Sequence, residues 1–147
     1  MKHFIISFLF STLLFGNICL ANNTNIPQTV LSSFKTRFHD AQSISWTDSK
    51  DYYKVWFSSN GQTYCAFYSH DEDFVAVTRQ LDVTQLPLLL QHKLQKKYEK
   101  FAVCALLEVQ QDDTISYYAE LENDKTDLVI KSGLDGEWRE FLRAKRK

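Results

Sequence analysis

Apolar residues in this chain change their spacing twice, in the same order each time. Pro27 opens a stretch in which apolar residues recur every three or four positions, and Pro87 opens another. That spacing, with proline in the first turn, predicts two amphipathic helices. The positions that align at a constant offset of 60 are Val30 with Leu90, Phe34 with Leu94, and Phe38 with Tyr98. The chain is therefore predicted to contain two related units, 27–81 and 87–143.

Each predicted helix is followed by segments in which apolar and polar residues alternate, the pattern of half-buried strands. These segments are 41–46, 52–58, 62–69 and 74–81 in the first unit, and 102–109, 115–121, 127–131 and 137–142 in the second. An offset of 64 places Phe57 on Leu121 and Phe74 on Trp138. We expect an α+β fold of two tandem repeats. Each repeat is a helix followed by about four antiparallel strands, with the helices packed on one face of the sheet.

The Asn-Gly pair at 60–61 fixes the register of one predicted hairpin. A two-residue turn needs positive φ at both central positions, which Asn and Gly tolerate best. Residues whose numbers sum to 121 then face each other, so Val55 opposes Ala66 and Phe57 opposes Tyr64. Because that face has no charged residue, we predict that it packs beneath a helix.

The opposite face of the same hairpin pairs Trp56 with Cys65 and Lys54 with Phe67, with Tyr52 at its end. A sheet covered by helices on one side leaves its other side available, and aromatic side chains beside a lysine are typical of protein-binding surfaces. The residues predicted to contact a partner protein are Tyr52, Lys54, Trp56 and Phe67. The alternative is that a helix, a loop or the other repeat covers Trp56 and Phe67, which would make them ordinary core residues.

The first 21 residues have the pattern of a cleavable secretory signal peptide. Their apolar run, 4–15, is about 12 residues long and too short to span a bilayer. Small side chains follow at 19 and 21, the positions that signal peptidase requires. We expect a cleaved signal at 1–21, a flexible leader at 22–26 and one domain at 27–147, in a periplasmic or secreted protein. A lipoprotein signal, a retained anchor and a buried N-terminal helix are the alternatives.

The charge balance restricts the class of partner. With 17 basic and 18 acidic residues, the chain lacks the positive surplus that binding a phosphate backbone requires. The lysines that follow the apolar face of the second helix, Lys93, Lys96, Lys97 and Lys100, are predicted to face solvent. The basic residues of 139–147 are interpreted as a solvated tail. We therefore expect no nucleic-acid partner.

The cysteines raise the question of a disulfide, because an exported chain meets an oxidising compartment. Of the three cysteines, only Cys65 and Cys104 remain after the predicted cleavage. An oxidising compartment permits one disulfide between them. Because they fall in separate strand patterns, we expect two small buried free thiols instead.

Sequence motifs of catalysis are missing from the chain, which has no Gly-rich phosphate loop, His-Glu-x-x-His, Cys-x-x-Cys or Gly-x-Ser-x-Gly. A nucleophilic Cys65 or Cys104 would need a histidine base and an orienting group in a geometry that sequence does not specify. The His-Asp-Glu-Asp turn at 70–73 lacks the spread of ligands and the glycine of a cation-binding loop. We therefore predict no enzyme activity, no cofactor and no metal site.

The order of several motifs resembles the secreted PepSY-like proteins, also described as beta-lactamase-inhibitor-like and common in Bacteroidetes. The motifs are the aromatic strand 52–57, the Asn-Gly turn 60–61, Leu86-Pro87 at the second helix start and Asp135-Gly136. The resemblance spans roughly 27–143. It implies two repeats of a helix and an antiparallel sheet, export, no cofactor and no catalytic residues. It also implies a protein partner bound through a sheet surface and loops.

The sequence thus predicts an exported, non-enzymatic protein-binding or inhibitor-like module. Its partner is an unidentified protein, with an envelope or extracellular enzyme as the candidate class. The alternative is a carrier of a small apolar ligand in the envelope, with a cavity between helix and sheet. No membrane insertion is expected after signal cleavage.

Overall fold

The computed structural model describes residues 25–133 and 135–146. The predicted signal peptide, and residues 22–24 of the predicted leader, lie outside the described residues. Within the described ranges, no helix has both the length and the apolar character needed to cross a bilayer.

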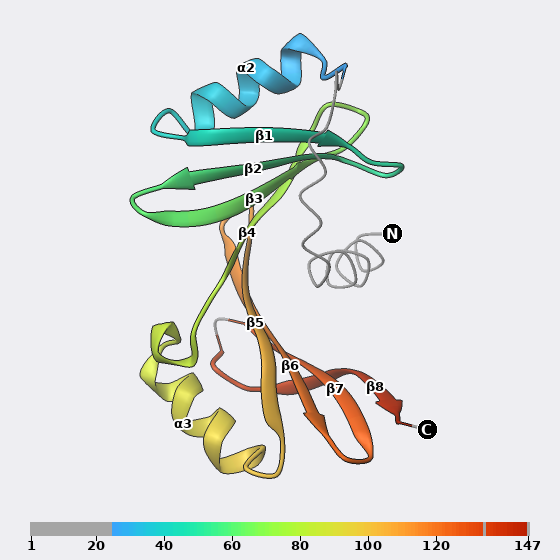
Figure 1. Cartoon of the computed structure of the whole chain (residues 1–147). Coiled ribbons are helices and arrows are strands. Elements are labelled where there is room, and N and C mark those ends of the chain that lie inside the picture. The colour runs from blue at the N-terminus through green and yellow to red at the C-terminus, as the bar shows by residue number, and fades with distance from the viewer. Residues whose placement is uncertain (1–24, 134, 147) are drawn as a thin grey trace.

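The described chain forms two helix-and-sheet units in sequence, shown in Figure 1. The first contains α2 (Gln28–Arg37), β1 (Gln42–Asp48), β2 (Tyr53–Ser59), β3 (Gln62–Tyr68) and β4 (Phe74–Gln80). The second contains the short helix η1 (Val83–Gln85), α3 (Leu88–Lys97), β5 (Ala102–Gln111), β6 (Thr114–Asn123), β7 (Thr126–Ser132) and β8 (Arg139–Lys145). All eight strands join one open antiparallel sheet in the order of the sequence. The prediction of two helices, each followed by four antiparallel strands, is confirmed.

Helix α2 begins after Pro27, whose missing N–H costs nothing at a helix start. Val30 and Phe34 are buried on its inner side, against β2. The ring of Phe34 meets the rings of Phe57 and Trp46 edge-on, with centroids 5.2 and 5.3 Å apart. The apolar spacing that predicted this helix is therefore the spacing that packs it on the sheet.

Helix α3 repeats this arrangement in the second unit. It begins after Pro87 and buries Leu90 and Leu94. The residues packed beneath it include Leu106, Leu121, Leu128, Ile130 and Trp138. The indole of Trp138 is 2% exposed, and its N–H donates to the carbonyl oxygen of Leu90. This hydrogen bond joins the loop before the last strand to α3 at the edge of the second core.

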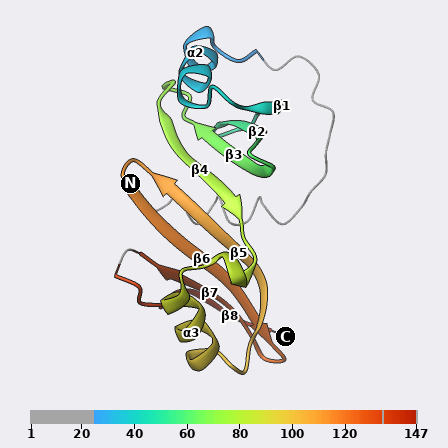
Figure 2. The same ribbon diagram turned by 90° about the vertical axis from the view of Figure 1, so that its left-hand side faces the viewer.

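Both helices cover the same face of the sheet. Val77 of β4 packs against the core beneath α2 and pairs with Gln110 of β5. Leu106 lies an even number of residues before Gln110, so it shares that face, and it packs beneath α3. Figures 1 and 2 show the two helices toward opposite ends of the sheet. The prediction that both helices pack on one face of the sheet is confirmed. The other face has no helix within the described ranges, and we name it the helix-free face.

The β2–β3 hairpin has the register that its turn predicted. Asn60 and Gly61 have φ of 50° and 74°, and Val55 pairs with Ala66. The equivalent β6–β7 hairpin keeps this register around a turn of different residues, at 124–125. The strand pairing is therefore repeated even where the turn residues are not.

The two units are joined between β4 and β5. Their ladder is short and runs from Val77 opposite Gln110 to Gln80 opposite Leu107. Arg79 and Glu108 face each other within it, in a two-pronged ion pair with N···O distances of 2.8 and 3.1 Å. Because both side chains are largely shielded from water, this pair is stronger than a surface ion pair. The junction makes one continuous sheet of the two repeats.

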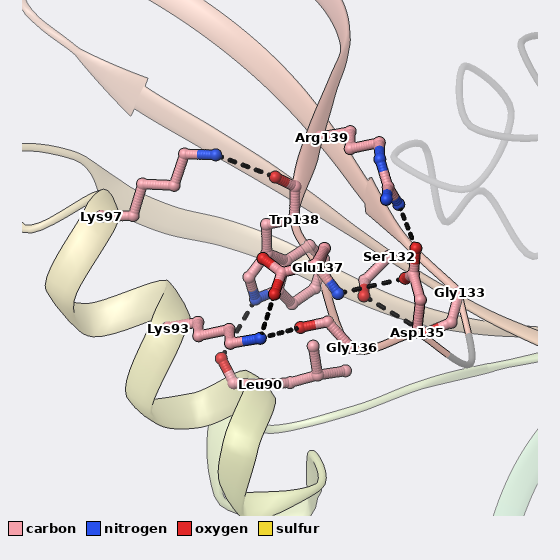
Figure 3. A network of polar contacts seen from close by, with 10 residues as sticks. All are labelled: Leu90, Lys93, Lys97, Ser132, Gly133, Asp135, Gly136, Glu137, Trp138 and Arg139. Atoms are coloured by element: carbon pink, nitrogen blue, oxygen red, sulfur yellow. Dashed lines mark hydrogen bonds and ion pairs between the residues drawn. The ribbon is translucent and has the colours of Figure 1, made fainter.

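The segment before β8, drawn in Figure 3 with its polar contacts to α3, departs from the prediction. A strand was predicted from residue 137, but β8 begins at Arg139, and Gly136 has a positive φ of 68°. Lys93 donates to the carbonyl oxygen of Gly136 at 3.0 Å, and Lys97 donates to that of Trp138 at 2.9 Å. These two lysines tie the loop to α3. Lys97 is exposed as predicted and Lys93 is half-buried, and the contacts of their ammonium groups with the loop are what the sequence did not predict.

Strand β8 extends through most of the predicted C-terminal tail. Backbone pairing with β7 orders 139–145, so this segment is a strand and not a tail, although its basic side chains are exposed as predicted. Arg143 pairs with Glu140, and Arg146 pairs with Asp127 at 2.8 Å. Charged side chains on an edge strand oppose pairing with another chain.

Cys104 is exposed, although burial was predicted. It lies in a bulge of β5, between Val103, which pairs with Leu121, and Ala105, which pairs with Glu120. The extra residue of a bulge has no partner across the ladder, so the burial expected from alternation fails there. Cys65 is buried as predicted, and both thiols are free.

Candidate binding surface on the helix-free face

The helix-free face of β2 and β3 holds the four residues predicted to contact a partner. Trp56 lies opposite Cys65, and Lys54 lies opposite Phe67. Tyr52, immediately before β2, packs against Cys65 and Phe67. Every second side chain of a strand points to the same face, so the hairpin register alone brings these residues together.

Trp56 is the most exposed of these four side chains. Its exposed fraction is 37%, while Cys65 across the ladder is fully buried. Removal of a large accessible aromatic side chain from water by a partner lowers the free energy of the complex. Trp56 is therefore the candidate centre of the surface.

Phe67 is buried, with an exposed fraction of 1%. The ring of Tyr52 meets it edge-on with centroids 6.2 Å apart, and Val75 packs beside it. The ammonium nitrogen of Lys54 lies 5.6 Å from its ring centroid, within reach of a cation–π interaction. The buried Phe67 ring thus contacts both Tyr52 and Lys54 and restricts their side-chain positions. Its own contact with a partner stays a prediction.

The two thiols are poorly suited to nucleophilic chemistry. Burial raises the pKa of Cys65 to about 12, and the charge of Lys54 offsets only part of that rise. Partial desolvation, together with Glu122, raises the pKa of Cys104 to about 11. Because the thiolate is the reactive form, both cysteines are weak nucleophiles at neutral pH.

The acidic turn at 70–73 is held by its own backbone. The N–H of Ser69 donates to the carbonyl oxygen of Asp73 at 2.8 Å, and the N–H of Glu72 donates to that of Ser69 at 3.0 Å. The Glu72 carboxylate accepts a hydrogen bond from the hydroxyl of Thr29 on α2. Across the residues that the structure describes, no group of three or more His, Cys, Asp or Glu side chains could hold a metal ion.

The helix-free face continues across β5 to β8, where the sequence predicted no site. Val109 and Tyr118 are buried there and pack with Phe141. Two grooves of about 560 and 220 Å³ adjoin on this face, and Ser116 and Lys131 line both. Both grooves are open to solvent and have charged lining residues. Neither is the enclosed apolar cavity that the carrier alternative requires.

Sequence reasoning missed Tyr118 and Lys131. The structure pairs them across β6 and β7, with the Lys131 ammonium nitrogen 5.2 Å from the Tyr118 ring centroid. The signal that could have found them is the offset of 64, which places Lys54 on Tyr118 and Phe67 on Lys131. The second repeat therefore has a lysine–aromatic contact at the same place as the first.

Solved structures with the same fold come from several Bacteroides species. A DUF2874 family protein from Bacteroides ovatus matches 84% of this chain and 89% of its own, with a TM-score of 0.73 at 16% sequence identity. A BLIP-like protein from Bacteroides fragilis matches 84% and 89%, with a TM-score of 0.69 at 11% identity. A protein from Bacteroides eggerthii, provisionally described as periplasmic, matches 83% and 90%, with a TM-score of 0.69 at 16% identity.

No protein-family model matches the chain, and no curated protein matches its sequence. The likeness to the Bacteroides structures covers nearly all of both chains at low identity. It therefore shows the fold, and the fold that the PepSY-like resemblance implied is confirmed.

Proposed function

We propose that this chain is an exported, non-enzymatic module that binds a protein through its helix-free face, in the manner of an inhibitor. The observation that carries the proposal is the exposed Trp56 on β2, with Lys54 and Tyr52 beside it. Tryptophan and tyrosine are enriched at the centres of protein interfaces. The fold shared with a BLIP-like protein supports the proposal by analogy.

The arrangement of the four residues suggests how they would act. Trp56 would enter a pocket of the partner and lose its contact with water. Phe67, already buried, would fix the rings and stems of Tyr52 and Lys54 so that little side-chain entropy is lost on binding. A rigid aromatic centre of this kind typically provides much of the affinity of an interface.

Protein capture from the native envelope fraction tests this role. The tagged full chain, the Trp56→Ala variant and the Leu88→Ala variant are compared, and bound proteins are identified by mass spectrometry. Leu88 is a matched control because it is an apolar residue 82% exposed on α3, on the opposite side of the sheet. We expect Trp56→Ala to weaken capture of a specific protein by roughly thirtyfold, as loss of an interface hot spot does, and Leu88→Ala to leave it unchanged.

Two outcomes would contradict the proposed role. Capture of the same proteins in the same amounts by Trp56→Ala would show that the helix-free face is not the binding surface. Turnover of a substrate by the purified chain would replace the inhibitor-like role with an enzymatic one.

Export and domain boundaries belong to the same proposal. We place a cleaved signal at 1–21, a leader at 22–26 and the binding domain at 27–147, in a protein of the periplasm or the medium. N-terminal sequencing of the protein recovered from its host should begin at Asn22. Recovery of the intact N-terminus from the cytoplasm would overturn export without affecting the binding surface.

A further inference from the structure

We infer that the helix-free face has a second contact point in the C-terminal repeat, the pair Tyr118–Lys131, and that it recognises a partner protein with carboxylates at two separated positions. The inference rests on the proposed function and specifies its partner. Lys54 and Lys131 are the two cationic anchors, one in each repeat.

The two anchors have the same geometry. Lys54 lies directly opposite Phe67 across β2 and β3, and Lys131 lies directly opposite Tyr118 across β7 and β6. The ammonium nitrogens lie 5.6 and 5.2 Å from the respective ring centroids. The ring holds the long lysine stem in one place and thereby reduces the entropy lost when the ammonium binds an acceptor.

The positions of lysine and aromatic residue are exchanged between the repeats. At the offset of 64, residues 53–68 align with 117–132, and Tyr53 with Tyr117 is the single identical pair. The lysine–aromatic contact survives this divergence because a lysine replaces the ring and a ring replaces the lysine. The contact is therefore present in both repeats, although neither position keeps its residue type.

Both lysines have unused charge. Among the described residues, neither Lys54 nor Lys131 has a carboxylate within salt-bridge distance, whereas Arg79, Arg139 and Arg143 each have one. An ammonium group has three donors, and a cation–π contact does not satisfy them. Each lysine can therefore donate hydrogen bonds to a carboxylate of another molecule.

The surroundings favour discrete carboxylates over a continuous polyanion. Between the anchors, the face is formed by the buried, uncharged side chains of Phe67 on β3, Ala76 on β4 and Val109 on β5. Asp112 and Glu140 line the grooves next to Lys131 and would repel a phosphate backbone or an anionic membrane. A folded protein with an apolar patch flanked by acidic side chains fits this pattern of charge.

Model peptides test the inference without the native partner. Each peptide has one glutamate at either end of a flexible Gly-Ser spacer, in a series of increasing spacer length, and its matched peptide has glutamine instead. Binding to the full chain is measured by calorimetry at low salt. The protein variants are Lys54→Gln, Lys131→Gln and the double variant, with Lys96→Gln on the exposed side of α3 as the charge-matched control.

We expect the glutamate peptides to bind more tightly than the glutamine peptides, with a best spacer length that reflects simultaneous engagement of both anchors. Each single variant should weaken glutamate-peptide binding by about fivefold, and the double variant by roughly twentyfold. Lys96→Gln should have no effect. Thermal unfolding of each variant separates loss of binding from loss of fold.

Equal binding of the glutamate and glutamine peptides, or equal binding by the double variant and Lys96→Gln, would overturn the inference. Binding of phosphatidylglycerol vesicles with no preference for the glutamate peptides would overturn it in favour of a membrane. The inference can fail while the proposed function stands. If Trp56→Ala abolishes envelope capture while the double lysine variant does not, the face binds a protein but the anchors do not select carboxylates.

Discussion

Trp138 donates its indole N–H to the carbonyl oxygen of Leu90 at 3.0 Å, and this hydrogen bond links the loop before β8 to the first turns of α3. The aligned residue of the first repeat, Phe74, packs against the core beneath α2 and has no polar hydrogen to donate. The same place in the two repeats is thus filled by a purely apolar ring in one and by a hydrogen-bonded ring in the other.

Replacing Trp138 by Phe should separate the packing of this ring from its hydrogen bond. The phenyl ring keeps much of the apolar contact but leaves the carbonyl oxygen of Leu90 without the indole donor. We expect the free energy of unfolding to fall by about 1–3 kcal/mol, and by about 3–5 kcal/mol for Trp138→Ala, which also opens a cavity. Urea denaturation measures both variants. Equal stability of Trp138→Phe and the wild type would mean that the hydrogen bond contributes nothing.

The Gly61→Ala variant should isolate the backbone cost of the first hairpin turn. Gly61 has a φ of +74°, and a methyl group there would meet no atom within 4 Å, so the cost is conformational alone. We expect a loss of roughly 1 kcal/mol. Gly133→Ala is the matched control because it also meets no atom within 4 Å and has no positive φ. Equal effects of the two substitutions on the melting temperature would contradict this explanation.

Glu120 should make the protein less stable as the pH rises. Burial raises its pKa above the ordinary value, and the neighbouring charges of Asp127 and Glu122 add to the rise. A raised pKa means that the folded state binds the proton more tightly, so stability falls between the ordinary and the raised pKa. We expect Glu120→Gln to melt at a higher temperature than the wild type at neutral pH, with the difference vanishing below the ordinary pKa of glutamate.

The exposed Asp113 provides the control for that experiment. Asp113→Asn should shift the melting temperature little over the same pH range. If the melting temperatures of Glu120→Gln and the wild type differ by the same amount at every pH, ionisation of Glu120 does not destabilise the folded state.

The two thiols should differ in their reaction with a thiol-specific reagent. Cys65 is buried with a pKa of about 12, so it should be modified only after unfolding. Cys104 is exposed but has a pKa of about 11, so it should react slowly at neutral pH and about tenfold faster for each unit of pH up to that value. Peptide mass spectrometry locates the label. Native modification of Cys65 at neutral pH would contradict its burial.

Most of the fold could be predicted from the sequence because local signals agree with tertiary packing. The apolar spacing after Pro27 and Pro87 marks the buried sides of α2 and α3, and the turn at 60–61 fixes a register that the structure reproduces. The failures lie where tertiary contacts decide. The outward Cys104 depends on a bulge, and the loop before β8 depends on hydrogen bonds from Lys93 and Lys97.

The candidate surface was only half predictable. Alternation around the first hairpin placed Lys54 and Trp56 on one face, but it did not reveal that Phe67 is buried there. Tyr118 and Lys131 were not predicted because the lysine and the aromatic residue exchange places between the repeats, which leaves no sequence similarity at either position. The offset of 64 aligns them with Lys54 and Phe67, and the pairing across β6 and β7 shows that they are in contact.

The junction of β4 with β5 joins the last strand of one repeat to the first strand of the next. Such head-to-tail joining has no built-in end, because β8 corresponds to β4 and β1 corresponds to β5, and identical molecules could extend the same sheet into a fibre. Growth is opposed at one edge by the charged side chains of Arg139, Glu140, Arg143 and Lys145. At the other edge it is opposed by a break in the β1 ladder at Ser43, whose φ is 52°. Neutralising the charges of β8 would therefore remove one of the two features that keep separate molecules from joining edge to edge.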